Sequence, residues 1–267
     1  MLPGQAFTVW SCAGEGYPCM ADVTFERQLH LILDRAPATL RDQFQWTIDQ
    51  VTRAGIGSFG ELLAIVQDET ADPELRVAVC WLLGQWGNKR AAYALLRAFG
   101  SAQDQLRQQA AHALGVLGSK AAVRPLLHAL QAEHSAERRA DAAYALGHLG
   151  DARAVEPLLR VLKDRQEAAR VRGQAAESLA YLPDRTPAVR AALTDALADT
   201  QVEVRFWAAF ALGQIADSDD HAAIQALERL AATDTATLPG WWTVRQEATA
   251  ALEHIKQMAD GARDQHG

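Results

Sequence analysis

The chain has 267 residues, a formal net charge of −7 and 7% aromatic residues. This acidic balance argues against nucleic-acid binding, because neutralising phosphates requires a broad basic face. No apolar run approaches the ~18 residues that a membrane span requires, and the N-terminus lacks the basic-then-apolar order of a secretory signal. We therefore expect a cytoplasmic protein without a membrane anchor.

Residues 1–19 contain glycine and proline without helical periodicity, and we expect them to form a flexible tail. Met20 opens a segment that resembles a natural beginning, so translation from Met1 and translation from Met20 both stay open. Cys12 and Cys19 do not have the spacing of a zinc site, and no metal is expected there.

Residues 20–71 predict a degenerate helical cap, with helices at about 23–34, 39–53 and 59–68. Leu40, Arg41 and Ile48 form a weak copy of the phrase that recurs further along the chain. Terminal repeats of a tandem array are expected to be atypical, because one of their faces must meet water.

From residue 72 to residue 258 one phrase recurs: an arginine, then small and apolar residues, then Leu-Gly in most copies. The arginines are spaced by 31, 32, 33, 33 and 40 residues. A period in this range indicates one supersecondary unit copied in tandem, each copy burying its apolar face against its neighbours. The copies begin at Arg76, Arg107, Arg139, Arg172, Arg205 and Arg245.

Each copy predicts a first and a second helix, because small and apolar residues follow the arginine at a 3.6-residue period. Gly87, Gly118 and Gly150 are expected to end first helices, since glycine accepts the left-handed conformation of a C-terminal cap. Cys80 takes a core position and is expected to be a buried thiol. The expected helices are 73–87, 90–100, 104–117, 121–132, 136–149, 153–163, 168–182, 187–198, 201–216, 220–232 and 243–258, followed by a frayed C-terminus at 259–267.

The phrase Arg-(x)2-Ala-Ala-x-(Ala)-Leu-Gly resembles the short bacterial HEAT-like repeat first associated with phycobilin lyase subunits, over about residues 72–256. The resemblance implies an all-α fold, a right-handed α-solenoid of helix pairs. It also implies that the recurring arginines form a structural ladder, each pairing with an acid near the end of the preceding unit. Asp199, six residues before Arg205, fits that role.

The chain offers no constellation that performs chemistry, so we expect no enzyme, no cofactor and no metal. The acidic turn Asp217–His221 lacks the glycine and the distal glutamate of a calcium loop. Some HEAT-repeat iron hydroxylases carry His-Glu pairs at the starts of their first helices. None of the equivalent pairs in this sequence is His-Glu, so we do not expect a hydroxylase of this class. The pairs are Val77-Ala78, Gln108-Gln109, Ala140-Asp141, Gly173-Gln174 and Phe206-Trp207.

One candidate binding surface is an outward-facing set of rings on the first helices. Five residues after the arginine stand Trp81, His112, Tyr144, Glu177 and Phe210, with Trp207, Tyr181 and His148 nearby. Contiguous exposed rings are typical of a partner surface. The alternative is that these rings pack between successive first helices.

A second candidate surface is a basic stripe on the second helices, whose exposed side is expected to line a concave face. Arg97, His128 and Arg160 stand at equivalent places in three copies, flanked by Arg124 and Lys163. Such a stripe fits an acidic protein segment. The alternative is a solvated polar face, with Glu156 and Asp164 interspersed.

These observations favour a non-catalytic protein–protein interaction scaffold or adaptor. The resemblance implies a second hypothesis, a lyase-like or chaperone-like subunit that acts on a tetrapyrrole-bearing protein. A third, HEAT-like nucleic-acid binding, is disfavoured by the acidic charge. The partner and the oligomeric state stay open.

Overall fold

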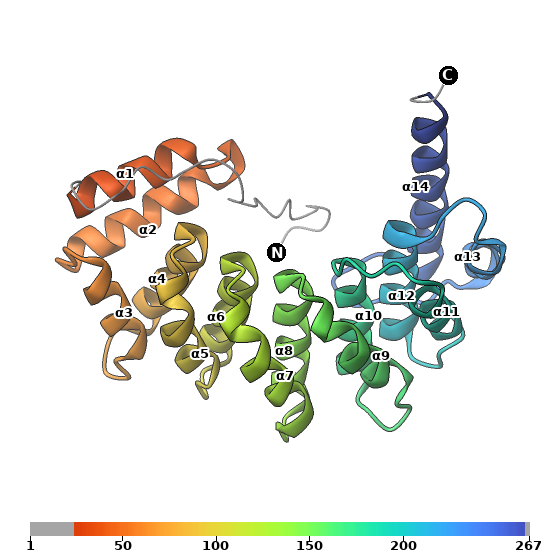
Figure 1. Cartoon of the computed structure of the whole chain (residues 1–267), viewed down its shortest axis with the longest axis horizontal. Helices are drawn as coiled ribbons and strands as arrows, with labels where there is room; N and C mark the ends of the chain where they lie inside the picture. Colours follow the sequence, from red (N-terminus) through yellow and green to blue (C-terminus); the bar gives the residue numbers. More distant parts are fainter. Residues whose placement is uncertain (1–23, 265–267) are drawn as a thin grey trace. The chain divides into compact units, whose positions relative to one another are not determined.

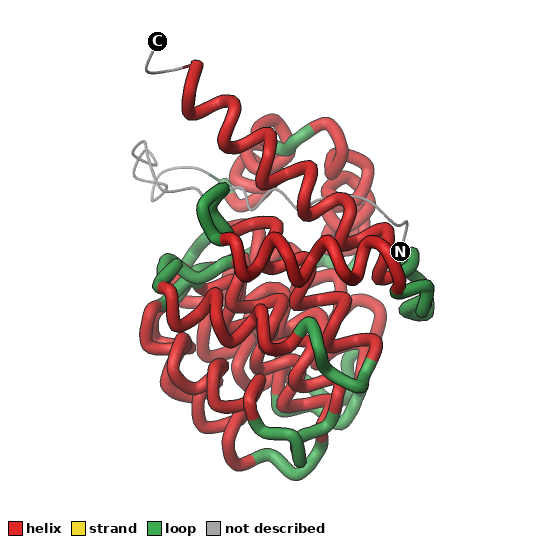
Figure 2. The backbone as a smooth tube through the Cα atoms, turned by 90° about the vertical axis from the view of Figure 1, so that its right-hand side faces the viewer, coloured by secondary structure: helices red, strands yellow, loops and turns green. Residues whose placement is uncertain are grey.

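The computed structural model describes residues 24–264, which form helices joined by short loops (Figures 1 and 2). Within these residues the only β-type pairing is an isolated bridge between Thr237 and Thr243. The prediction of an all-α fold is confirmed. The predicted flexible tail at residues 1–19 lies outside the described residues.

The chain divides into two compact units. Their described parts are residues 24–125, here the N-terminal unit, and residues 126–264, here the C-terminal unit. The division falls within α7 (Val123–Ala132), inside the repeat array. Each unit is a set of packed helices with its own apolar core.

The N-terminal unit contains the three helices expected for the cap and the first repeats. Its helices are α1 (Phe25–Arg35), α2 (Arg41–Arg53), α3 (Phe59–Gln67), α4 (Pro73–Trp86), α5 (Ala92–Phe99) and α6 (Asp104–Leu117). Trp86 packs between Phe25 and Phe59, with ring centroids 5.7 and 5.4 Å away, so the cap covers one end of the repeat array. Cys80 is buried as expected, and burial raises the pKa of its thiol to about 12.

The helix ends lie where the local sequence sets them. Asp72 accepts a hydrogen bond from the Leu75 backbone N–H at 2.8 Å, and Pro73 follows in the first turn of α4, where it sacrifices no helical bond. Gly87, with a φ of 74°, ends α4 in the left-handed conformation. The glycine caps predicted for three first helices are therefore confirmed, since Gly118 and Gly150 also have positive φ.

The C-terminal unit repeats the helix pair with close agreement to the predicted ranges. Its helices are α8 (Ala136–Leu149), α9 (Val155–Lys163), α10 (Ala169–Ala180), α11 (Pro187–Ala196), α12 (Val202–Ile215), α13 (His221–Thr233) and α14 (Val244–Asp264). Only α14 clearly exceeds its predicted range, which ended at residue 258. Its last core residue is Ile255, and no proline follows to stop the helix.

Successive first helices approach each other at the glycine of the Leu-Gly phrase. A Cβ atom at Gly84 would lie 2.8 Å from the Cα atom of Ala113, and one at Gly147 would lie 2.6 Å from the Cβ atom of Ser178. Real Cβ contacts are essentially never this short, so these two copies need glycine here and a small residue in the next copy. The Leu-Gly phrase thus sets the distance between neighbouring repeats.

The recurring arginines form a ladder between repeats, as expected, but in the opposite direction. Arg205 Nε donates to Asp234 at 2.7 Å, whereas its Nη1 reaches only the backbone carbonyl of Asp199, at 2.8 Å. The Asp199 carboxylate instead pairs with Arg172 and Arg165. The predicted Arg205–Asp199 ion pair is therefore wrong, because Arg139, Arg172 and Arg205 each pair with an acid at the start of the next unit. In the N-terminal unit, Arg107 pairs with Asp104 of its own helix, and Arg76 donates to the backbone carbonyl of Val66.

The same arrangement occurs at Arg139, two repeats before Arg205. Arg139 donates to both carboxylate oxygens of Glu167, at 2.9 and 2.7 Å, and to the carbonyl of Glu133 at 2.8 Å. Burial alone would raise the pKa of Glu167, Asp199 and Asp234, but hydrogen bonds from the arginines and from backbone N–H groups outweigh it and lower each pKa. These carboxylates therefore stabilise the fold in their ionised form.

The Arg172–Asp199 pair offers a test of this ladder. Both side chains are almost fully buried, and removing one charge strands the other. Asp199→Asn should lower the free energy of unfolding by roughly 3 kcal/mol at pH 7, the scale of a broken buried pair. Because the folded pKa of Asp199 is depressed, the difference from wild type should shrink as the pH falls through that pKa, below about 4.

The measurement is urea unfolding at pH 7 and pH 3. Arg153→Ala is the control, because Arg153 is exposed in its pair with Asp151, and exposed ion pairs contribute little to stability. Equal losses in the two variants would contradict a ladder that stabilises through burial.

Candidate functional site

Stacking of the first helices brings equivalent positions of three repeats together in the C-terminal unit. Tyr144, Glu177 and Phe210 each stand five residues after the recurring arginine, on α8, α10 and α12. Helix α10 packs against both α8 and α12. A carboxyl group is thereby flanked by a ring on either side.

The rings make a chain of contacts across these helices. Ring centroids are 4.1 Å apart for Tyr144 and His148, 4.6 Å for His148 and Tyr181, and 6.3 Å for Tyr181 and Phe210. The chain continues through Trp207, 5.7 Å from Phe210, to Trp241, 5.0 Å further on. We call this set the aromatic row, and its members are Tyr144, His148, Tyr181, Phe210, Trp207 and Trp241.

The aromatic row is only partly buried. Tyr181 is 36% exposed and Trp241 is 41% exposed, while the other four rings are intermediate. The rings pack between successive helices, as one of the two alternatives expected, and they also reach solvent. Their role as a partner surface stays a prediction. Trp241 joins from the loop between α13 and α14, which the repeat pattern did not identify as part of the row.

Glu177 has an unusual environment within the row. Its only hydrogen bond is from Gln174 Nε2, at 2.6 Å, and among residues 24–264 no cation forms an ion pair with it. Burial raises the pKa of Glu177 to about 7, although the Gln174 amide opposes the shift. Burial of the tyrosine side chains, together with the charge of Glu177, raises the pKa of Tyr144 and of Tyr181.

Two further acids lie at the Trp241 end of the row. Glu247 is buried and accepts a hydrogen bond from Trp242 Nε1 at 2.7 Å. Burial raises the pKa of Glu203 and of Glu247, against the charge of Arg170 in the first case and the Trp242 bond in the second. His148 differs, because burial lowers its pKa and favours the neutral ring. The row therefore combines ring faces with poorly solvated carboxyl groups.

Two predicted members of the aromatic surface lie elsewhere. Trp81 is only 5% exposed and packs edge-on against Phe44 of α2, with centroids 4.5 Å apart. The expectation of an exposed ring is therefore wrong for Trp81, because the cap supplies a helix that covers it. His112 is half-buried on α6, also in the N-terminal unit.

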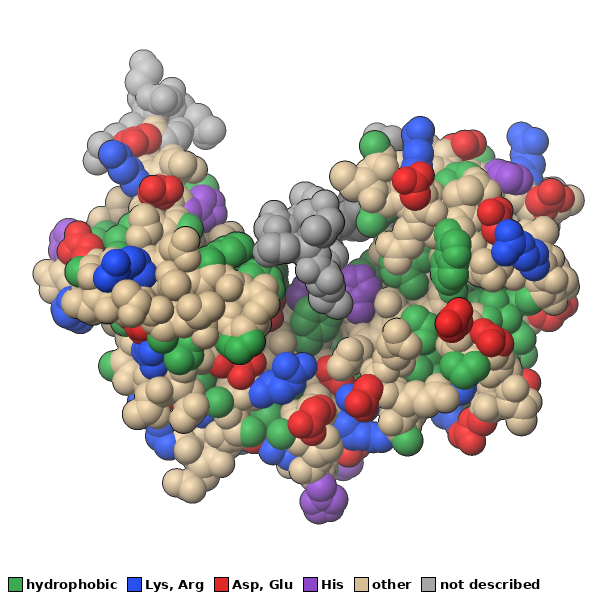
Figure 3. Space-filling model, turned by 180° about the vertical axis from the view of Figure 1, so that it is seen from behind, with side chains coloured by type: hydrophobic (Ala, Val, Ile, Leu, Met, Phe, Trp, Pro, Cys, Tyr) green, Lys and Arg blue, Asp and Glu red, His purple; other side chains and the backbone are tan. Residues whose placement is uncertain are grey.

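The predicted basic stripe is exposed but divided between the units. Arg97 and Arg124 belong to the N-terminal unit, whereas His128, Arg160 and Lys163 belong to the C-terminal unit. Figure 3 shows Lys and Arg side chains interspersed with Asp and Glu over the visible face, with no continuous patch of one sign. The structure shows no feature on this stripe comparable to the contacts within the aromatic row.

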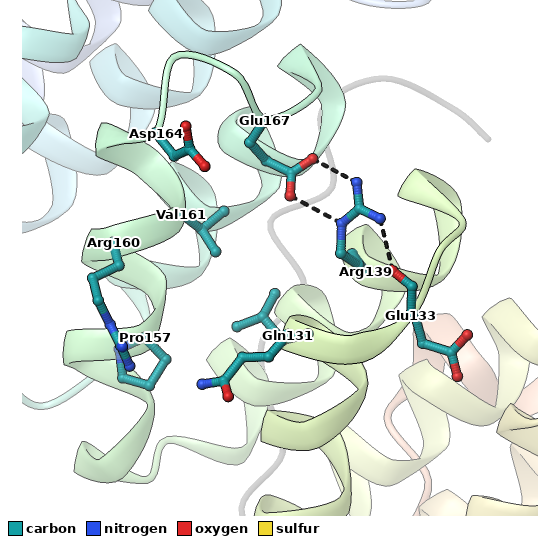
Figure 4. Close-up of a pocket in the computed structure, with 9 residues that line it drawn as sticks. Gln131, Glu133, Arg139, Pro157, Arg160, Val161, Asp164 and Glu167 are labelled. Carbon is teal, nitrogen blue, oxygen red and sulfur yellow. Dashed lines mark hydrogen bonds and ion pairs between the residues drawn. The ribbon is translucent and has the colours of Figure 1, made fainter.

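Arg160 borders a shallow hollow lined by residues of α7, α8 and α9 and of the loops beside them (Figure 4). Acidic residues dominate its rim: Glu133, Asp164 and Glu167, the last already paired with Arg139. A hollow with this lining does not favour an acidic ligand. The ion pair between Arg139 and Glu167 at its rim belongs to the arginine ladder between repeats.

The described residues contain no group of three or more His, Cys, Asp or Glu side chains placed to hold a metal ion. In the acidic turn, Asp220 caps α13 and pairs with Arg190 at 2.8 Å, and Asp217 lies 3.5 Å from the same arginine. None of the helices in residues 24–264 is long and apolar enough to cross a membrane. The aromatic row therefore stands as the candidate site, and it points to binding.

Comparison with known proteins connects this arrangement to a repeat family. The profile described as HEAT repeats matches residues 61–147 and 165–253, and the one described as PBS lyase HEAT-like repeat matches residues 138–164. The search among curated proteins gave no match. Sequence families thus support the repeat that the arginine spacing indicated.

Several solved structures are similar. The CpcE–CpcF complex of phycocyanin lyase from Nostoc sp. PCC7120 gives a TM-score of 0.50 at 23% identity, covering 61% of this chain and 98% of that chain. A designed armadillo repeat protein in complex with the peptide (KR)4 gives 0.48 at 20% identity, covering 74% and 100%. Human deoxyhypusine hydroxylase in complex with glycerol gives 0.39 at 20% identity, covering 87% and 97%. At these identities the likeness concerns the fold alone.

The environment of Glu177 yields a prediction about stability. A carboxyl whose folded pKa is raised costs nothing below its unfolded pKa of about 4.5, and it destabilises the fold as the pH rises through about 7. Glu177→Gln removes that cost. Since one pKa unit corresponds to about 1.4 kcal/mol, the variant should be about 1–3 kcal/mol more stable than wild type at pH 8.

Urea unfolding of both proteins at pH 5 and pH 8 measures the effect. The variant-minus-wild-type difference is the relevant quantity, because His148, with its lowered pKa, changes stability in the opposite direction in both proteins. A variant that is less stable than wild type at pH 8 would contradict the assignment.

Proposed function

The chain belongs to the HEAT repeat family, and we propose that it is a non-catalytic scaffold that binds a segment of a partner protein. Stacked repeats offer an extended surface to which several units contribute, and this is how solenoid proteins bind their partners. Among residues 24–264 there is no group of three or more His, Cys, Asp or Glu side chains placed to hold a metal ion, and Asp220, for example, serves as a helix cap and in an ion pair.

We place the binding surface at the aromatic row. The observation that carries this choice is the unbroken chain of ring contacts from Tyr144 to Trp241, with Tyr181 and Trp241 still exposed. Contiguous apolar surface costs solvation unless a partner covers it. Tyrosine and tryptophan are also the residues that most often supply binding energy at interfaces.

The rival surface is the basic stripe formed by Arg97, Arg124, His128, Arg160 and Lys163. Its occupant would be an acidic segment. The intermixed acids of the second helices, such as Glu156 and Asp164, weaken that case. One experiment can test both surfaces.

A second candidate function is a lyase-like or chaperone-like role on a tetrapyrrole-bearing protein. The match of residues 138–164 to the PBS lyase HEAT-like repeat favours it. Co-expression with a bilin-carrying protein tests it, because visible absorbance that copurifies with the chain would support this role. Nucleic-acid binding is the least favoured alternative, and the absence of a gel shift at low salt would exclude it.

The scaffold proposal predicts how two surface variants will differ. Tyr181→Ala combined with Trp241→Ala should remove partner proteins that wild type captures, because the two most exposed rings of the row are lost. Arg97→Gln combined with His128→Gln and Arg160→Gln should retain them. Affinity capture of tagged full-length chains from cells of the source organism, with quantitative mass spectrometry, measures the difference.

Thermal unfolding of both variants is the control. Each of the three substitutions in the basic stripe should change the free energy of unfolding by less than about 0.5 kcal/mol, because the side chains are exposed. If the aromatic variant is folded, its loss of capture cannot be explained by unfolding. Loss of the same partners from the basic-stripe variant alone would move the site to the second helices and to an acidic segment.

A further inference from the structure

We propose that the aromatic row accepts a cationic segment of the partner, with a lysine or arginine side chain lying against the ring faces and pairing with Glu177. This inference rests on the proposed function and specifies the chemistry of the partner. It follows from the juxtaposition of one unpaired carboxyl group with rings from three consecutive repeats.

The carboxyl group is the first argument. Glu177 lies between the equivalent ring positions of the neighbouring repeats, Tyr144 and Phe210, and only the Gln174 amide hydrogen-bonds it. By contrast, two partly buried acids between repeats of the same unit are paired with arginine, Glu167 with Arg139 and Asp234 with Arg205. A carboxylate withdrawn from water without a cation is costly, and a cation from outside would compensate it.

The rings are the second argument. The faces of tyrosine, tryptophan and phenylalanine carry negative electrostatic potential and attract an ammonium or guanidinium group. Tyr181 bridges His148 on α8 and Phe210 on α12, so rings border the neighbourhood of Glu177 on both sides. An arginine side chain fits this combination well, because it stacks on rings and donates to a carboxylate with the same planar group.

The charges near the row point the same way. Glu203 on α12 and Glu247 on α14 add two more poorly solvated carboxyl groups toward the Trp241 end. Among the residues that the structure describes, Arg170 is the cation whose charge acts on Glu203, and none acts on Glu247. An acidic segment would meet these carboxyl groups with like charge, whereas a basic segment would meet opposite charge along the row.

Peptide binding to the full-length chain tests the inference. The probes are octapeptides in which glycine alternates with arginine, lysine, glutamine or glutamate, and titration is followed by calorimetry and by the tryptophan fluorescence of the chain. We expect the arginine and lysine peptides to bind, and the glutamine and glutamate peptides not to bind.

Matched variants locate the site. Glu177→Gln keeps the shape of the side chain and removes its charge, and it should weaken the arginine peptide at least about tenfold. Tyr181→Ala should weaken it about fivefold, the scale of one lost cation–π contact. Glu156→Gln is the control, because it removes an equal charge from an exposed position on α9 and should leave the affinity unchanged.

Two results would overturn the inference: glutamine peptides that bind as well as arginine peptides, or equal losses in Glu177→Gln and Glu156→Gln, which would indicate attraction to net charge alone. If no peptide binds while partner capture still depends on Tyr181 and Trp241, the cationic segment is excluded and the scaffold function stands. If capture is also independent of those rings, both proposals fail.

Discussion

The close approach of successive first helices is the constraint on which the rest of the C-terminal unit depends. A Cβ at Gly147 would collide with Ser178, and one at Gly213 would lie 2.9 Å from the Cα atom of Ala251. Because glycine meets a small residue at these two steps, α8 packs closely against α10, and α12 against α14. Side chains on the adjoining face, such as Tyr144 and Phe210, are then brought within reach of their neighbours one repeat away.

Ion pairs fix the repeats at a second level. Each ladder arginine in the C-terminal unit also reaches backbone carbonyls just before its own helix, so that one guanidinium joins a loop to the following repeat. The acids that pair with these arginines, such as Asp199, have lowered pKa values, whereas Glu177, which has no arginine partner among the described residues, has a raised pKa. For these acids the direction of the pKa shift therefore depends on whether an arginine pairs with the acid, and not on whether the acid is Asp or Glu. This contrast is the reason why we propose Glu177 as the position that pairs with a cation of the partner.

The aromatic row, the binding surface that we propose, is assembled from several parts of the C-terminal unit. Its parts come from different elements: His148 from α8, Tyr181 from the end of α10, and Trp241 from the α13–α14 loop. The departure of the last copy from the regular period lengthens that loop, which carries two tryptophans. Irregularity at the end of the array thus supplies surface that the regular repeats do not.

The sequence by itself determined the repeat, the helix ranges and the glycine caps, because spacing and capping are local properties of the chain. Helix α8, for example, spans the predicted residues 136–149. The sequence also pointed to Tyr144, Trp207 and Phe210, because periodicity indicates which face of its own helix a residue occupies. Only the tertiary structure decided that Trp81 is core, that Arg205 pairs with Asp234, and that Trp241 completes the row. Whether a helix face is covered, and by what, depends on elements distant in sequence, and no local pattern records their placement.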